Sequence, residues 1–122
     1  MTKNVVTKGP NDDLTRIAEE MQRHKIGSVV IVENRKPVGI LTERDFVRIV
    51  ERLGALLEKG LAKYHMTTPV LSVHSDTPLT EVVKLMDEKH IRHLIVLEKN
   101  GEVGGVISSR DLMKVKEHVM TV

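Results

Sequence analysis

The chain has 122 residues and a formal net charge of +2 at neutral pH, and 40% of its residues are hydrophobic, which suits one compact module or two small halves that share a core. It has no cysteine, which excludes disulfides, thiolate nucleophiles and cysteine-based metal sites, and its aromatic residues, Phe46 and Tyr64, are too few to favour stacking on nucleic-acid bases. Because no apolar run approaches the roughly 18 residues of a membrane helix and no signal-peptide core is present at the start, we expect a soluble, cytoplasmic protein without membrane attachment.

The first predicted strand and helix lie within residues 5–24. Val5-Val6-Thr7 favours a short strand, which Gly9-Pro10 ends. Asn11-Asp12-Asp13 then offers short polar side chains that accept hydrogen bonds from the free amides of a first helical turn. Apolar residues recur at the i, i+3, i+4 and i+7 spacing of one helix face, namely Leu14, Ile17, Ala18 and Met21. We expect this face to pack in the core.

Two strands follow this helix. Lys25-Ile26-Gly27 interrupts the helical pattern, and Ser28 to Val32 forms a nearly continuous apolar strand of the kind that is buried on both faces. Residues 33–37 turn the chain, and Val38 to Leu41 returns as a second strand.

Thr42 begins a second predicted helix. Its apolar face has the same spacing as the first and consists of Phe46, Ile49, Val50 and Leu53. Gly54 and Gly60 break the charged, leucine-bearing stretch through Lys63. We interpret that stretch as the end of the helix and a linker.

The second half of the chain repeats this order of elements. Val70 to Val73 favours a short strand. Thr77-Pro78 predicts a helix cap followed by proline at the first helical position, where its missing amide costs nothing. We expect a helix over Leu79 to Lys89, whose apolar face is Leu79, Val82, Val83 and Met86.

A hairpin and a last helix complete the second half. Asn100-Gly101 separates strands over Leu94 to Leu97 and Val103 to Ile107, and both turn residues tolerate positive φ, which predicts a two-residue hairpin loop. Ser108 begins the last helix, which we expect to run to about His118.

One motif is present twice. Gly39-Ile40-Leu41-Thr42-Glu43-Arg44-Asp45 is answered 66 residues later by Gly105-Val106-Ile107-Ser108-Ser109-Arg110-Asp111. Positions before the hairpin repeat at a spacing of 65, including the opening Met1 to Val6 with Met66 to Leu71, so the second hairpin holds one extra residue. The chain is therefore two copies of one β-α-β-β-α unit. We expect an α+β fold with repeats over residues 1–63 and 64–122.

The hydroxyl and acid of the motif support two interpretations. Thr42-x-x-Asp45 and Ser108-x-x-Asp111 are close to a capping box, in which each side chain pairs with an amide of the first turn. The same pair places a hydroxyl and a carboxylate at a strand end and a helix N-terminus, where free amides and the helix dipole favour an anion such as phosphate. A carboxylate there can also accept hydrogen bonds from a ribose diol. The two roles are compatible.

Two further stretches extend the pattern over essentially the entire chain: Ile91-Arg92-His93-Leu94-Ile95-Val96 and Met66-Thr67-Thr68-Pro69-Val70. Together with the motif, this ordered set resembles a tandem pair of CBS domains, often called a Bateman module. The resemblance implies two repeats packed about a pseudo-twofold axis, with adenine nucleotides or S-adenosylmethionine bound in two clefts between them. These would be regulatory ligands, and neither a metal nor a cofactor is implied.

The resemblance also implies roles for individual residues. Asp45 and Asp111 would hold ribose hydroxyls, with Thr42 and Ser108 near the ribose or phosphate. In the Asp111 cleft, adenine would lie against Val5, Val6, Ile26 and Gly27, with Val106 beneath. In the Asp45 cleft, it would lie against Val70, Leu71, Ile91 and Arg92, with Ile40 beneath.

The two clefts differ at equivalent positions. Gly27 corresponds to Arg92, and Ser28 corresponds to His93. Arginine can fork onto phosphate oxygens and histidine can add charge below neutral pH, so we predict that the Asp45 cleft prefers phosphorylated ligands such as AMP, ADP or ATP. The alternative for Arg92 and His93 is a solvated strand start.

The motif contains an arginine in each copy. Arg44 and Arg110 either approach phosphates from the helix N-terminus or are surface residues at a dimer contact. The sequence leaves both interpretations open.

The function predicted from this pattern is that of a stand-alone regulatory module. It would bind AMP, ADP, ATP or S-adenosylmethionine, form a homodimer through its helices and signal to an unidentified partner protein. Base and ribose contacts are shared among these ligands and NAD, so the sequence does not rank them.

Other function classes fit less well. An enzyme is not predicted, because His90-x-x-His93 lacks a third ligand and the glutamate of a zincin motif, and no nucleophile stands beside a base. Nucleic-acid binding, which would depend strongly on salt, lacks a recognised motif. A purely structural dimerisation module would show no response to adenosine ligands.

Overall fold

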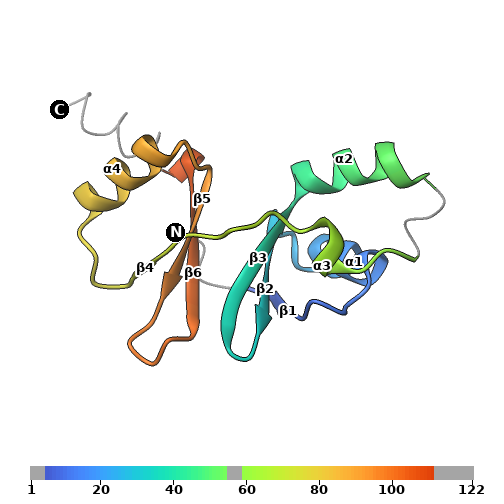
Figure 1. Ribbon diagram of the computed structural model, residues 1–122, viewed down its shortest axis with the longest axis horizontal. Coiled ribbons are helices and arrows are strands. Elements are labelled where there is room, and N and C mark those ends of the chain that lie inside the picture. The colour runs from blue at the N-terminus through green and yellow to red at the C-terminus, as the bar shows by residue number, and fades with distance from the viewer. Residues whose placement is uncertain (1–4, 55–58, 112–122) are drawn as a thin grey trace. The chain divides into compact units, whose positions relative to one another are not determined.

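The chain forms two compact units, each containing helices and a small sheet (Figure 1). The computed structural model describes residues 5–54 and 59–111. We call Val6–Val70 the N-terminal unit, and we call Met1–Val5 with Leu71–Val122 the C-terminal unit. The predicted α+β class is confirmed. The division of the sequence into repeats at residues 63 and 64 stays a prediction.

The N-terminal unit has a mixed sheet with the strand order β1-β2-β3. Its strands are β1 (Thr7–Lys8), β2 (Ser28–Glu33) and β3 (Lys36–Thr42), of which β1 runs parallel to β2 and β2 antiparallel to β3. Its helices are α1 (Leu14–His24), α2 (Glu43–Leu53) and α3 (Ala62–His65).

The C-terminal unit repeats this arrangement. Its strands β4 (Ser72–His74), β5 (His93–Leu97) and β6 (Val103–Ser108) form a sheet of that order, with β4 parallel to β5 and β5 antiparallel to β6. Helix α4 (Leu79–Lys89) connects the parallel pair. Residues 109–111 are helical, and the rest of the last predicted helix, through His118, lies outside the described residues. Across residues 5–54 and 59–111, no helix has the length and apolarity needed to cross a membrane.

Helices α1 and α4 end in the same way. Lys25 and His90 both adopt the left-handed conformation, with φ of 54° and 53°, and each donates its amide to the carbonyls at the end of its helix. Glycine usually occupies this position because it has no Cβ to clash. The predicted helix break at Lys25 is therefore a left-handed cap, and the equivalent residue of the second repeat adopts it too.

Each unit has its own apolar core. In the N-terminal unit the core joins α1 and α2 to the sheet, and its fully buried members include Leu14, Ile17, Val29, Ile31 and Leu41. This confirms the predicted face of the first helix and the strand buried on both faces. In the C-terminal unit, Val82 and Met86 of α4 pack with Leu94 of β5.

The start of α4 differs from the prediction. Thr77 does not cap the helix: its hydroxyl accepts a hydrogen bond from His74 N, its own amide donates to His74 O, and Pro78 is the N-cap residue without a side-chain bond. Asp13 does cap α1, because its Oδ1 accepts from Arg16 N at 2.8 Å. Leu79 is 48% exposed, so this residue of the predicted apolar face is not part of the core, unlike its equivalent Leu14.

The two hairpins explain the extra residue in the second repeat. Glu33 pairs with Lys36 across a two-residue loop in which Asn34 and Arg35 both have positive φ. In the second hairpin the Glu98 amide donates to the Glu102 carbonyl at 2.8 Å, which leaves three residues in the loop, and Gly101 alone among these three has a positive φ of 85°. The predicted two-residue loop at Asn100-Gly101 is wrong. A three-residue loop with glycine in the left-handed position is a common alternative.

The buried face of α2 also differs from the prediction. Ile49 is buried, Phe46 and Leu53 are half-buried, and Val50 is 51% exposed. The helix instead turns Asp45, one turn before Ile49, toward the interior. The hydrophobic spacing takes no account of a buried carboxylate, so it included Val50 in this face and left Asp45 out.

Candidate functional site

Both copies of the motif lie where a strand passes into a helix. Thr42 ends β3 and is the N-cap of α2, and Ser108 ends β6 before the helical residues 109–111. In each copy the first helical amide is held by the backbone at the start of the preceding hairpin. Glu43 N donates to Gly27 O at 3.0 Å, and Ser109 N donates to Arg92 O at 2.8 Å.

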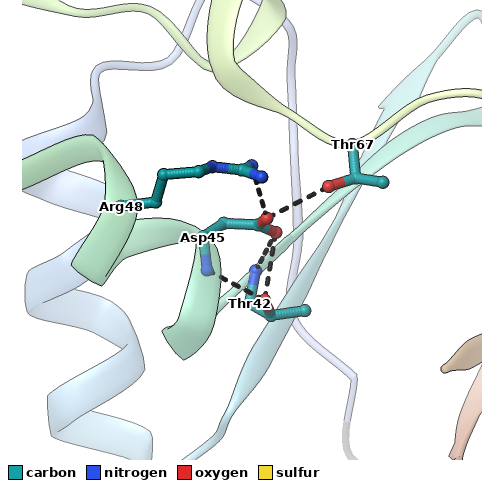
Figure 2. Close-up of polar contacts among 4 residues, drawn as sticks. All are labelled: Thr42, Asp45, Arg48 and Thr67. Carbon is teal, nitrogen blue, oxygen red and sulfur yellow. Dashed lines mark hydrogen bonds and ion pairs between the residues drawn. The ribbon is translucent and has the colours of Figure 1, made fainter. Parts of the chain in front are cut away.

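The Asp45 carboxylate is the centre of the first copy (Figure 2). It is 7% exposed, and its Oδ2 accepts from Thr42 N at 2.9 Å and from Thr42 Oγ1 at 3.0 Å. Its Oδ1 accepts from Arg48 Nη2 at 2.9 Å and from Thr67 Oγ1 at 3.1 Å. The Asp45 amide donates back to Thr42 Oγ1 at 3.1 Å, which completes a capping box. The capping interpretation of the first copy is confirmed.

Arg48 and Thr67 are site residues that the sequence interpretation missed. Arg48 lies one turn after Asp45 on α2, and its side chain is 57% exposed. Thr67 lies beyond α3 and is held beside β3 by two backbone bonds, Thr67 N to Ile40 O at 2.9 Å and Ile40 N to Thr67 O at 3.2 Å. The helical spacing from Asp45 was a signal for Arg48. For Thr67, the sequence offered only the repeated Met-Thr opening, which marks this segment as part of the repeat. It did not indicate that Thr67 contacts Asp45.

The second copy has the same cap with less burial. Ser108 N donates to Asp111 Oδ2 at 2.9 Å, and Asp111 N donates to Ser108 Oγ at 3.3 Å. Both residues are half-buried, whereas Thr42 and Asp45 are buried. The predicted capping chemistry is therefore present in both repeats.

The helix N-terminus offers less to an anion than the sequence indicates. Two of the first three amides of α2 are already paired, Glu43 N with Gly27 O and Asp45 N with Thr42 Oγ1, which leaves at most that of Arg44. A phosphate near Asp45 would therefore depend on side-chain cations more than on backbone amides.

The other residues of the predicted ligand sites are distributed over both units. Arg44, Ile40, Val6, Ile26, Gly27 and Val70 belong to the N-terminal unit, and Val5, Leu71, Ile91, Arg92, His93, Val106 and Arg110 belong to the C-terminal unit. Ile40 and Val106 are buried, and Arg44, Arg92 and Arg110 are exposed. The exposure of the three arginines agrees with either role considered for them. That residues of both units share one adenine stays a prediction.

Backbone bonds fix two of the predicted base contacts. Val6 O accepts from Val30 N at 3.2 Å, and Leu71 O accepts from Ile95 N at 3.0 Å. These are equivalent positions, because each leads into the strand parallel to the central strand of its sheet. Both residues are half-buried, so part of each side chain stays accessible.

A groove of about 530 Å³ lies in the N-terminal unit between α1 and α2. Four apolar and three polar residues line it, namely Ala18, Met21, Gln22, Lys25, Ile26, Glu43 and Phe46. Ile26 is the one predicted ligand contact among these residues. Neither Thr42 nor Asp45 lines the groove, so it is distinct from the carboxylate site.

His65 ends α3, two residues before Thr67. Burial lowers the pKa of His65 below its ordinary value of 6.5, and the positive charge of Arg52 on α2 lowers it further. Both causes disfavour the imidazolium, so this histidine resists protonation in the folded chain.

The sequence and the fold are shared with known proteins. The family model described as "CBS domain" matches residues 1–52 and 61–118. An uncharacterized protein of Methanopyrus kandleri, MK0525, is 38% identical over 119 residues, which are 97% of this chain and 61% of that protein. The chain thus spans about three fifths of the length of that relative.

Two solved structures resemble the fold closely. The CBS-domain containing protein ATU1752 from Agrobacterium tumefaciens matches with a TM-score of 0.76 and 32% identity, over 93% of this chain and 90% of that one. The CBS domain protein PAE2072 from Pyrobaculum aerophilum, whose structure is a complex with AMP, matches with a TM-score of 0.74 and 29% identity, over 92% and 86%.

Proposed function

Because the chain belongs to the CBS-domain family, as a protein with two CBS repeats, we propose that it is a regulatory module that binds adenosine-containing ligands such as AMP, ADP, ATP or S-adenosylmethionine. In this proposal it catalyses no reaction. Ligand binding changes the equilibrium between two states of the module, and an unidentified partner protein responds to that change. The proposed location is the cytoplasm.

The Asp45 carboxylate is the observation that carries the proposal. It lies at a strand-to-helix junction and is held in one orientation by the Thr42 amide and hydroxyl. Its other oxygen accepts hydrogen bonds from Arg48 and Thr67, which are both exposed residues. An oriented carboxylate of this kind is a good acceptor for sugar hydroxyls. The AMP complex of the Pyrobaculum aerophilum protein supports the choice of ligand class.

We further propose that the Asp45 site prefers phosphorylated ligands. Arg44 and Arg92 are exposed cations that the sequence prediction assigns to this site, and Arg92 has glycine at its equivalent position in the other repeat. Since the α2 amides are largely paired, these side chains would supply the phosphate contacts.

The experiment is isothermal titration of the wild type, Asp45→Ala and Asp111→Ala with AMP, ADP, ATP, S-adenosylmethionine and NAD. We expect the wild type to bind at least one ligand, and Asp45→Ala to lose more affinity for the nucleotides than Asp111→Ala. Equal losses would contradict the phosphate preference. No heat with any ligand would contradict the proposed function.

A homodimer is the proposed assembly, and one observation on α2 favours it. Val47 is 72% exposed and Val50 is 51% exposed, three residues apart on the same helix. Exposed apolar side chains grouped on one element are typical of an interaction surface. If the α2 face binds a second copy, Val47→Asp would convert the dimer to a monomer in light scattering. A purely structural dimerisation module would also become a monomer with Val47→Asp, but it would show no heat of ligand binding in the titration.

A further inference from the structure

We propose that the Thr67 hydroxyl competes with the ligand for the Asp45 carboxylate and thereby sets the affinity of this site. The inference rests on the proposed function, since it concerns the same carboxylate. This proposal gives Thr67, which lies outside the motif around Asp45, a role in regulating ligand binding.

The acceptor capacity of Asp45 is filled by the protein itself. An ionised carboxylate offers about four acceptor positions. Thr42 N and Thr42 Oγ1 occupy two of them on Oδ2, and Arg48 Nη2 and Thr67 Oγ1 occupy two on Oδ1. A sugar hydroxyl that donates to this carboxylate must therefore displace one of these four donors.

The four donors are not equally easy to displace. The Thr42 amide and hydroxyl are buried, and a buried donor that loses its partner pays the full cost of desolvation. Arg48 is exposed, but its bond joins two charges, and such bonds are about twice as strong as neutral ones. Thr67 is exposed and neutral, so its hydroxyl can turn to water at the lowest cost.

Displacement of this hydroxyl leaves the surrounding structure in place. Thr67 is held beside β3 by backbone bonds in both directions with Ile40, and neither bond involves the side chain. A rotation about the Cα–Cβ bond of Thr67 is therefore sufficient to free Oδ1. The Thr67 side chain then acts as an internal occupant of the site, which raises the ligand concentration needed for binding.

The test uses the full chain carrying Asp111→Asn, so that only the Asp45 site is measured. In this background, Thr67→Val removes the hydroxyl and keeps the shape of the side chain. We expect it to bind AMP about 5-fold more tightly, because the bond from Thr67 no longer has to be broken; the effect is modest since an exposed hydroxyl can bond to water instead. Thr67→Ser keeps the hydroxyl and should bind as the background protein does. Thr80→Val makes the same chemical change at an exposed position of α4 and should also leave the affinity unchanged.

A ligand without sugar hydroxyls sharpens the test. The 2′,3′-dideoxy form of AMP has no diol to donate, so Thr67→Val should bind it no better than the background protein does. A second variant, Thr67→Ala, should reproduce the gain for AMP if the valine disturbs folding. Far-ultraviolet circular dichroism and a melting curve would confirm that each variant is folded.

The outcomes separate this inference from the proposed function. Equal AMP affinity in Thr67→Val and the background protein would overturn the inference and leave the function standing. Weaker binding by Thr67→Val would make Thr67 a direct ligand donor, which also overturns the inference. A gain of equal size with the dideoxy ligand would show that competition for the carboxylate is not the cause. No AMP binding by any variant in this background would overturn the inference, and the titration of the wild type with all five ligands would then decide on the proposed function.

Discussion

The two copies of the motif make the same backbone hydrogen bonds but are buried to different extents. In both, the amide of the hydroxyl residue donates to the acid at 2.9 Å, and the amide of the acid donates back to the hydroxyl. Asp45 and Thr42 are buried, whereas Asp111 and Ser108 are half-buried. The backbone bonds of the cap therefore do not depend on how deeply the motif is packed, and burial has diverged between the repeats.

The same contrast holds at the starts of the helices that precede the motifs. Leu14 is fully buried, because the segment after α2 is bonded to this region through Leu14 N to Gly60 O at 3.0 Å and Ala62 N to Asp12 O at 3.0 Å. The equivalent Leu79 is 48% exposed. Equivalent residues in a duplicated sequence can thus contribute very differently to stability.

The largest expected effect is at this pair of leucines. Leu14→Ala should lower the free energy of unfolding by about 2–5 kcal/mol, because it removes a fully buried side chain and leaves a cavity. Leu79→Ala should cost less than about 1 kcal/mol, because half of its surface is already in water. Urea unfolding followed by circular dichroism measures both. Losses of similar size would show that the two positions are packed alike in solution.

The two motif carboxylates should differ next. Asp45→Ala leaves the buried Thr42 amide without its acceptor and should cost about 2–3 kcal/mol. Asp111→Ala should cost about 1 kcal/mol, because the half-buried Ser108 amide can bond to water instead. The measurement is the free energy of unfolding in ligand-free buffer. The contrast between the motifs is wrong if Asp111→Ala costs as much as Asp45→Ala.

The sequence predicted those parts of the fold that local pattern determines. The repeat, the order of the strands and of α1, α2 and α4, the face of α1 and the single extra hairpin residue are all present, whereas α3 lies in a stretch that was partly interpreted as linker. The exposure of Val50 was missed because the buried face of α2 includes Asp45, and hydrophobic spacing carries no information on a buried charge. Thr77 was expected to cap α4 because its type and position fit, yet its hydroxyl bonds to His74 in the preceding turn.

The candidate site was predictable only in part. Thr42 and Asp45 were found because the motif occurs twice at a strand-to-helix junction. Thr67 contacts Asp45 across 22 positions of sequence, through a strand-like pairing with Ile40 that no local signal indicates. Long-range contacts of this kind follow from packing, and a single sequence does not reveal them.

One pair of positions should behave identically in the two repeats. Lys25 and His90 have the same left-handed cap conformation, and both carry a side chain that this conformation disfavours. Lys25→Gly and His90→Gly should each raise the free energy of unfolding by about 0.5–1 kcal/mol. Thermal melts of the two variants and the double variant measure this. A gain at only one position would mean that the caps differ in strain although their φ values agree.

The smallest expected effect concerns pH and is confined to the N-terminal unit. His65 has a pKa below its ordinary value of 6.5, because burial and then Arg52 disfavour the charged form. The unfolded chain therefore binds a proton more readily, and the stability associated with the neutral imidazole is complete above pH 6.5 and is lost as the pH falls below it. When the pH falls from about 8 to about 5.5, the wild type should lose more free energy of unfolding than His65→Gln does. Urea unfolding at each pH measures this.

Arg52→Gln is the control, because it removes the second cause of the lowered pKa. Its free energy of unfolding should depend on pH less steeply than that of the wild type and more steeply than that of His65→Gln. Because desolvation is the larger cause, a slope for Arg52→Gln as shallow as that of His65→Gln would show that the charge of Arg52, and not burial, holds this pKa down.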